Sequence, residues 1–174
     1  MNGYIACWTV SWLHLTSFWN GCLMCSYLFC LLFTHCWWCW PDGCYRCGFS
    51  TTQAAYDEAS RDVREGLRRC EEKLSTQDFL CGSQFTEADL RLLPTMLRFD
   101  AAYAPLFKAG GTHLRIRSDY PHLHAWLKRC WAMPGIKDSI DLADATGSYF
   151  KQLFPLNPGG ILPTPPTAQD LGLE

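Results

Sequence analysis

The order of hydrophobic and polar positions divides the 174-residue chain into parts of different character. Residues 1–41 contain no Lys, Arg, Asp or Glu, whereas apolar and charged positions alternate with helical spacing from Asp42 onward. We therefore expect a charge-free, Trp- and Cys-rich segment over residues 1–41 and a helical domain over residues 42–154. Residues 155–174 are rich in proline and predict an extended tail that frays toward its end.

One apolar stripe marks a long helix near the start of the helical domain. Its positions recur at alternating spacings of three and four residues: Tyr56, Ala59, Val63, Leu67, Cys70 and Leu74. This spacing places them on one helix face, and the charged positions between them fall on the opposite, solvated face. Ser50 and Thr51 are the expected N-caps, and Gln53 completes a capping box with Ser50.

The stretch from Phe85 to Leu90 carries the signals of a second helix start. Thr86 is the expected N-cap, and Asp89 is the N3 residue of a capping box. Phe85 before the cap and Leu90 after it predict a hydrophobic staple between their side chains. A mostly apolar helix face follows, and Pro94 within it predicts a kink.

A third helix is predicted to begin at Pro121, which suits the first helical position, and to end at the Met-Pro-Gly sequence of residues 133–135. His122 and His124 lie two residues apart and so fall on different faces of this helix, which argues against a metal site there. Taken together, these stretches predict an all-α fold of about five to seven helices.

Two hypotheses remain open for the charge-free segment. Residues 21–40 form an apolar run of about the ~20 residues that cross a bilayer, but no basic residues flank it to set an orientation. The alternative is translated non-coding sequence without an evolved fold, so the structure of residues 1–41 stays uncertain. The net charge of −2 and the lack of a basic block argue against a nucleic-acid partner.

Eight of the eleven cysteines lie in the first 47 residues, and four of them form two Cys-x-x-Cys pairs in the stretch CWWCWPDGCYRCG. The pairs are Cys36 with Cys39 and Cys44 with Cys47, a spacing that suits a zinc ion or a thiol–disulfide centre. They straddle the boundary between the charge-free segment and the helical domain, and neither side offers an evident scaffold. We therefore predict no metal site.

Several blocks, in order along the chain, resemble one family. The stretch Phe79–Asp89, FLCGSQFTEAD, is similar to the capping-box and staple signature of the glutathione transferase C-terminal helical domain. Further blocks resemble the Xi class of that superfamily, the glutathionyl-hydroquinone reductases, also described as omega-like: YRCGFSTTQAAYDEA (Tyr45–Ala59), TEADLRLLPTMLRFDAAY (Thr86–Tyr103), RIRSDYPHL (Arg115–Leu123), MPGI (Met133–Ile136) and NPGGILP (Asn157–Pro163). The resemblance runs from about Asp42 to about Pro163.

The resemblance implies that residues 42–154 form a glutathione transferase C-terminal helical bundle. In the family a thioredoxin-fold domain precedes this bundle and carries the nucleophile in a Cys-Pro-Trp-Ala motif. Residues 1–41 show neither βαβ alternation nor a Cys-Pro-Trp sequence, so we expect that domain to be absent. The chain is then a truncated relative, inactive alone, to which we assign no catalytic residue, because the reaction needs a thiolate of low pKa.

The resemblance also implies the chemistry of the parent enzyme. That enzyme uses glutathione to reduce glutathionylated hydroquinones through a Cys thiolate. For this chain we expect, by the same resemblance, a homodimer formed through the helical domain and a cytoplasmic location. An organelle such as a plastid stays open, as does a membrane if residues 21–40 are a real span. A function from another class remains open, in which the helical domain is a non-catalytic protein-interaction module.

The family lines its hydroquinone site with tyrosines of the helical domain, and the matching positions are Tyr45 and Tyr149. A phenol at such a position hydrogen-bonds a substrate hydroxyl while its ring packs on the aromatic nucleus. Arg98 and Tyr103 lie in a matching block and are expected to be structural. Residues 144–148 read DATGS where the family has basic residues, which leaves the substrate preference open.

Overall fold

The computed structural model describes residues 39–111 and 113–174, and in this part of the chain the all-α prediction is confirmed. The α-helices are α2 (Cys39–Phe49), α3 (Gln53–Leu74), α4 (Glu87–Arg98), α5 (Ala104–Phe107), α6 (Ile116–Asp119), α7 (Pro121–Trp131) and α8 (Leu142–Gln152). A π-helix, Phe99–Tyr103, joins α4 to α5, and a 3₁₀ turn, Lys137–Ser139, precedes α8. The predicted boundary after residue 41 falls inside the first turn of α2.

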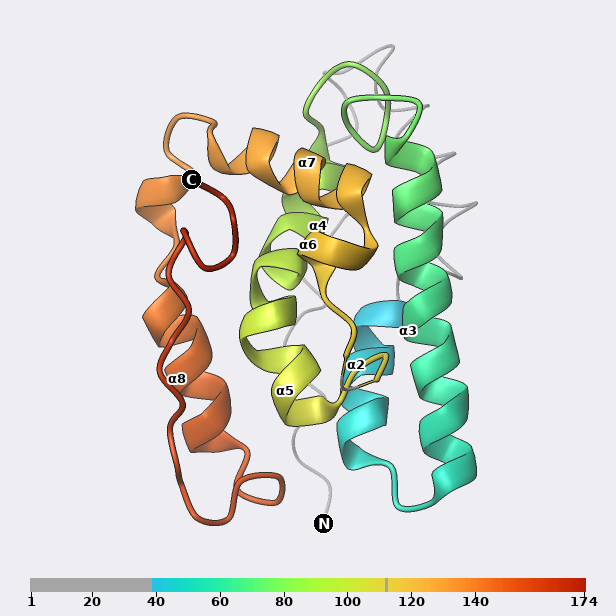
Figure 1. Cartoon of the computed structure of the whole chain (residues 1–174), viewed down its shortest axis with the longest axis vertical. Coiled ribbons are helices and arrows are strands. Elements are labelled where there is room, and N and C mark those ends of the chain that lie inside the picture. Colours follow the sequence, from blue (N-terminus) through green and yellow to red (C-terminus); the bar gives the residue numbers. More distant parts are fainter. Residues whose placement is uncertain (1–38, 112) are drawn as a thin grey trace, which may run out of the picture.

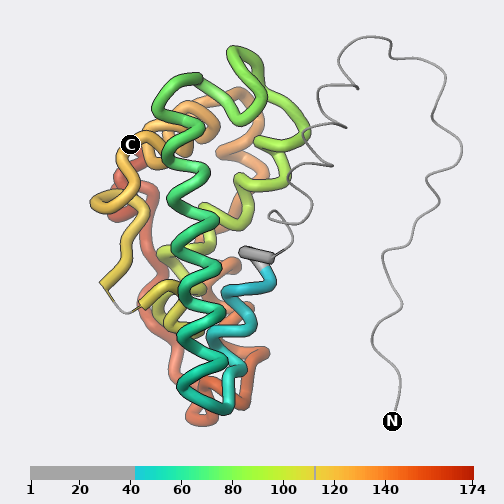
Figure 2. The backbone as a smooth tube through the Cα atoms, turned by 90° about the vertical axis from the view of Figure 1, so that its right-hand side faces the viewer, coloured from blue at the N-terminus to red at the C-terminus, as the bar shows by residue number. Residues whose placement is uncertain are grey.

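The helices pack as a bundle around α4. Figure 1 shows the short α2 and the long α3 on one side of α4 and α8 on the other, with α7 crossing over one end. Figure 2 shows α2 lying alongside α3. Gly48 permits a close approach between α2 and α5, because a Cβ at this position would lie 2.5 Å from Cδ1 of Phe107. No larger residue fits there without moving the Phe107 ring.

Helix α3 buries the predicted stripe but starts two residues later than expected. Ala59, Val63 and Leu67 are fully buried, and Leu74 near the end of the helix is 4% exposed. The N-cap is Thr52, whose Oγ1 accepts the N–H of Ala55, so the prediction of Ser50 or Thr51 was wrong. Ser50 instead donates its hydroxyl to the carbonyl of Arg46, at the end of α2. That bond uses the side chain that a capping box would have needed.

Helix α4 begins at a fully buried carboxylate. Oδ2 of Asp89 accepts the Thr86 N–H at 2.9 Å, which is the contact that the N3 residue makes in a capping box, and it also accepts the Thr86 hydroxyl at 2.8 Å. Oδ1 of the same side chain accepts the Leu80 N–H at 2.9 Å and the Trp126 indole N–H at 2.8 Å. This single buried side chain therefore ties the loop before α4, the first turn of α4 and the middle of α7 together.

The expected staple partner is not part of the core. The side chain of Leu90 is 52% exposed, while Phe85 packs edge-on against Phe79 with ring centroids 5.9 Å apart. Leu92, next to Leu93 on α4, is buried instead.

The C-terminal tail does not fray. After running back along α8 toward α7 (Figure 1), it ends with Leu173 only 5% exposed and with the Leu171 carbonyl 2.9 Å from Nε2 of His124. Gly172, at a φ of +68°, lies against Arg117, and a Cβ there would come within 2.9 Å of Nε of that side chain. The prediction of a fraying end was wrong, because the contacts that hold the end of the tail come from residues far away in the sequence. The prolines also reduce the entropy that ordering the tail costs.

Replacing Asp89 by Asn tests the contribution of the buried carboxylate to stability. Asn keeps the size but offers one acceptor oxygen and turns an NH₂ group toward donors, so buried N–H groups lose their partner. We expect the free energy of unfolding, measured by urea titration and circular dichroism, to fall by about 2–4 kcal/mol. Asp138→Asn at an exposed position should change it by less than about 0.5 kcal/mol. Equal stability of the two variants would contradict the proposed contribution of Asp89.

Candidate functional site

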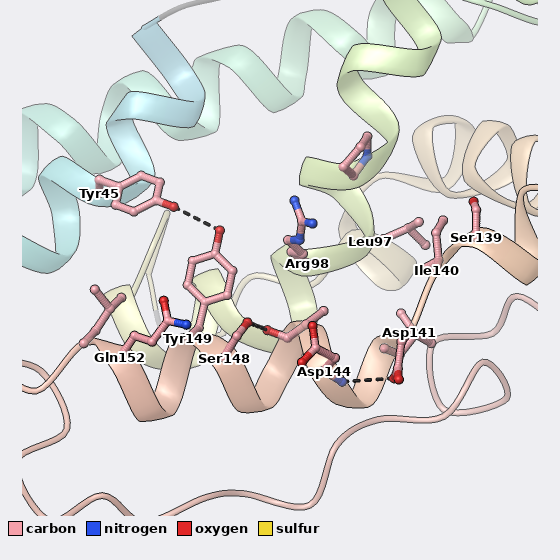
Figure 3. Close-up of a pocket in the computed structure, with 14 residues that line it drawn as sticks. Tyr45, Leu97, Arg98, Ser139, Ile140, Asp141, Asp144, Ser148, Tyr149 and Gln152 are labelled. Atoms are coloured by element: carbon pink, nitrogen blue, oxygen red, sulfur yellow. Dashed lines mark hydrogen bonds between the residues drawn. The ribbon is translucent and has the colours of Figure 1, made fainter. Parts of the chain in front are cut away.

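A pocket of about 590 Å³ opens between α4 and α8, with Tyr45 of α2 at one end (Figure 3). Pro94 and Leu97 of α4 and Leu142 of α8 give it apolar walls, and Tyr149 from the middle of α8 lies beside Tyr45. The structure therefore places the two tyrosines selected from the sequence, 104 residues apart, at one pocket. A volume of this size suits an aromatic small molecule.

Three tyrosine hydroxyls form a short hydrogen-bonded chain at this end of the pocket. The Tyr149 hydroxyl lies 2.9 Å from the hydroxyl of Tyr45 and 2.8 Å from that of Tyr103. The rings also contact one another. The ring of Tyr149 packs edge-on against that of Tyr103 with centroids 5.2 Å apart, and the ring centroids of Tyr45 and Phe107 are 4.9 Å apart. Ring packing on several sides holds the hydroxyls in place, so little reorientation is needed when a ligand arrives.

The direction of the chain follows from burial. Tyr103 is 5% exposed, so its proton needs an acceptor inside the protein, and Tyr149 is the acceptor in reach. A phenol carries one proton, so Tyr149 then donates onward to Tyr45. Tyr45, 37% exposed and lining the pocket, is left with its own proton free for a ligand. The arrangement thus offers a hydrogen-bond donor at the pocket surface.

The same hydroxyls are poor acids. Burial, and after it the interaction with Tyr149, raises the pKa of Tyr45 to about 12. Burial and the hydrogen bond to Tyr149 also raise the pKa of Tyr103 far above its usual range. Both phenols therefore remain protonated at neutral pH and serve as donors and acceptors of hydrogen bonds, not as general bases.

The π-helix explains how residues at the end of α4 reach this site. A π-turn holds more residues than an α-turn, so Tyr103 lies closer to the face of Arg98 than in a continuous α-helix. Arg98 lines the pocket, and Figure 3 shows its guanidinium on the side where the Tyr45 and Tyr149 hydroxyls meet. Both residues were expected to be only structural. Periodicity cannot reveal the placement of Tyr103, because the π-turn interrupts the period. Arg98 lies in regular α-helix, four residues after Pro94 and on the same face as that pocket residue.

Cys44, Cys47 and Cys130 do not offer an activated nucleophile. Burial, and after it the neighbouring Cys47, raises the pKa of Cys44 far above its usual range, and burial also raises the pKa of Cys47. Burial raises the pKa of Cys130 to about 12. A reactive thiol needs a lowered pKa and access to solvent, and these three have neither. Cys36 lies outside the described residues.

Other sites considered from the sequence have ordinary structural explanations or lie outside the described part. His122 places Nδ1 2.7 Å from Glu71, whose carboxylate also accepts the first N–H groups of α7. Within residues 39–111 and 113–174, no helix has the length and apolar character needed to cross a membrane. The hypothetical span over residues 21–40 lies outside this region except for its last two residues.

Comparison with known proteins assigns these helices to a family. Residues 53–129 match the family described as "Glutathione S-transferase, C-terminal domain". The glutathionyl-hydroquinone reductase YqjG of Escherichia coli is 40% identical over 75% of this chain and 38% of its own length. The glutathionyl-hydroquinone reductase PcpF of Sphingobium chlorophenolicum is 39% identical over 76% of this chain and 41% of its own length. The chain thus spans about two fifths of the length of these relatives.

Solved structures give the same assignment. The glutathione-bound structure of YqjG superposes with a TM-score of 0.68 at 42% identity, over 75% of this chain and 41% of that one. The Xi glutathione transferase of Phanerochaete chrysosporium superposes with a TM-score of 0.66 at 41% identity, over 72% of this chain and 42% of that one. The helical part of this chain therefore belongs to the glutathione transferase family, as a C-terminal helical domain of the Xi, or glutathionyl-hydroquinone reductase, type.

Proposed function

We propose that this domain binds the aromatic acceptor in a protein that reduces glutathionyl-hydroquinones with glutathione. The observation that supports this most strongly is the chain of three tyrosine hydroxyls that ends at the pocket surface on Tyr45. The relatives named as glutathionyl-hydroquinone reductases match this same domain. Glutathione is the expected co-substrate. In this proposal, the thiolate that attacks the glutathionyl-hydroquinone is not supplied by the described residues.

In this proposal the aromatic ring of the acceptor lies between Pro94 and Leu97 on one side and Leu142 on the other. One ring hydroxyl accepts the proton of Tyr45. The hydrogen bond from Tyr149 orients Tyr45, and Tyr103 in turn orients Tyr149. The site therefore binds the ring and fixes its oxygen, while chemistry at sulfur takes place beyond the pocket. A homodimer formed through the helical domain and a cytoplasmic location stay predictions.

The alternative function, a non-catalytic helical interaction module, does not require a pocket. It gives no reason for Tyr45 and Tyr149 to meet at one cavity. Their meeting therefore counts against it, since a docking surface needs exposed contacts and not hydroxyls that point into a cavity.

Replacing Tyr149 by Phe removes the central hydroxyl and leaves the ring packing. Tyr45 then loses the donor that orients it, so its own hydrogen bond to the ligand is weakened by about 0.5–1.5 kcal/mol. We expect the dissociation constant of 1,4-dihydroxybenzene, measured by calorimetric titration of the 174-residue protein, to rise roughly threefold to tenfold.

Tyr56→Phe is the matched control, because Tyr56 donates to the Lys108 carbonyl away from the pocket. This variant should bind as tightly as the unmodified protein. Binding to the unmodified protein should also stay constant from about pH 6 to pH 9, since the raised pKa of Tyr45 keeps it protonated throughout. Equal loss of affinity in the two variants would contradict a specific contribution of Tyr149.

A turnover assay tests whether this chain supplies the catalytic thiol itself. Because the thiols of Cys44, Cys47 and Cys130 are buried and have raised pKa values, we expect the purified 174-residue protein not to accelerate the reduction of glutathionyl-menadiol by glutathione. The measurement is the release of menadiol followed by chromatography. A rate above the protein-free control would overturn this expectation. Cys44→Ser and Cys47→Ser variants would then show whether either thiol is responsible.

A further inference from the structure

Arg98 is the only cationic side chain among the described residues that line the pocket. It ends α4, and Figure 3 shows its guanidinium between the α4 backbone and the hydroxyls of Tyr45 and Tyr149. The guanidinium of Arg98 makes no hydrogen bond or ion pair with another residue of the described part of the chain. A half-buried guanidinium carries five donors, and a pocket that leaves them unused is ready for a ligand that accepts hydrogen bonds.

Four arginines on α2, α3 and α4 outside the pocket are paired with carboxylates. Pairs of this kind join Arg46 to Glu58 and Asp62, Arg68 and Arg69 to Glu65, and Arg91 to Glu87. All of these arginines lie on outer faces of α2, α3 or α4, where solvent already screens the charge. Arg98, the arginine of the pocket, has no carboxylate partner of this kind among the described residues, and its charge lies in a half-buried position where solvent screens it less.

Arg98 also lies close enough to the tyrosines to affect them. Burial raises the pKa values of Tyr45 and Tyr103, and the positive charge of Arg98 offsets a small part of that rise. An anion bound by the guanidinium would therefore lie beside the hydroxyl that the pocket offers to a ligand. The two groups together fit an aromatic ring that carries a hydroxyl and an acidic substituent close to each other.

Two acidic residues, Asp141 and Asp144, also line the pocket, at the start of α8. Asp141 uses Oδ1 to accept the N–H groups of Ala143 and Asp144 at the start of α8. Asp144 is exposed at the same end of that helix. An anionic ligand therefore has one favourable orientation, in which its acidic group faces Arg98 and the tyrosines and points away from the start of α8.

We propose that Arg98 binds a carboxylate on the ligand and makes the pocket selective for hydroquinones that carry a carboxylate on the ring. The guanidinium matches a carboxylate with two parallel N–H···O bonds, which a neutral ring cannot replace. This inference rests on the proposed function, because it assumes that the pocket holds the aromatic acceptor. A carboxylate of glutathione is the other source of the same chemistry, and the experiment separates the two.

The test compares two ligands that differ only in the carboxylate. We expect 2,5-dihydroxybenzoate to bind the 174-residue protein about tenfold more tightly than 1,4-dihydroxybenzene in calorimetric titrations at low salt. Arg98→Gln should abolish this preference, and an unchanged circular dichroism spectrum and urea midpoint would show that the variant is folded. Arg98→Lys should keep part of the preference, because lysine keeps the positive charge but cannot donate the two parallel hydrogen bonds of a guanidinium.

Arg91→Gln is the matched control, since Arg91 lies on the exposed face of the same helix and pairs with Glu87. It should keep the full preference. Equal affinity of the unmodified protein for both ligands would overturn the inference about Arg98 and leave the proposed function standing. Failure of both ligands to bind would overturn both. Binding of glutathione alone that depends on Arg98 would assign the carboxylate to glutathione and overturn selectivity for carboxylated rings.

Discussion

The fold of this domain depends on one buried carboxylate. Asp89 accepts four hydrogen bonds, two of them from Thr86 and one each from the Leu80 N–H and the Trp126 indole. A carboxylate has about four acceptor positions, so this one is saturated without any cation. Burying an ion is tolerated only when its hydrogen bonds are complete. The segments that supply the donors must therefore all be in place before the carboxylate can be buried.

The position of the pocket follows from this anchor. Asp89 fixes the start of α4 against α7, and a helix of 12 residues carries that placement about 18 Å along its axis to Arg98. The π-helix after Arg98 then turns Tyr103 toward Tyr149 on α8. Because only Thr146 of α8 is fully buried, the hydroxyl and ring contacts with Tyr149 also help to locate this helix.

The sequence revealed features whose signals are local. The apolar stripe on α3 and the Thr86–Asp89 contacts follow from spacings of three and four residues, and the structure contains both. Features that join distant positions were inaccessible from periodicity. Tyr45 and Tyr149 were selected through family resemblance alone, and the contact of Tyr103 with Tyr149 depends on the π-turn that follows Arg98. The docked tail was missed for the same reason, since His124 and Leu171 meet only in the folded chain.

The separation of anchor and pocket along α4 has a consequence for the energetics. The buried network at the start of the helix stabilises the domain, whereas Arg98 at the other end holds a charge without a carboxylate partner within the described residues. An uncompensated charge in a pocket lowers stability slightly unless a ligand compensates it. The domain tolerates this cost because Asp89 sets the helix orientation independently of the pocket. Residues at the pocket end can therefore vary with the ligand while the four hydrogen bonds at the other end keep the fold.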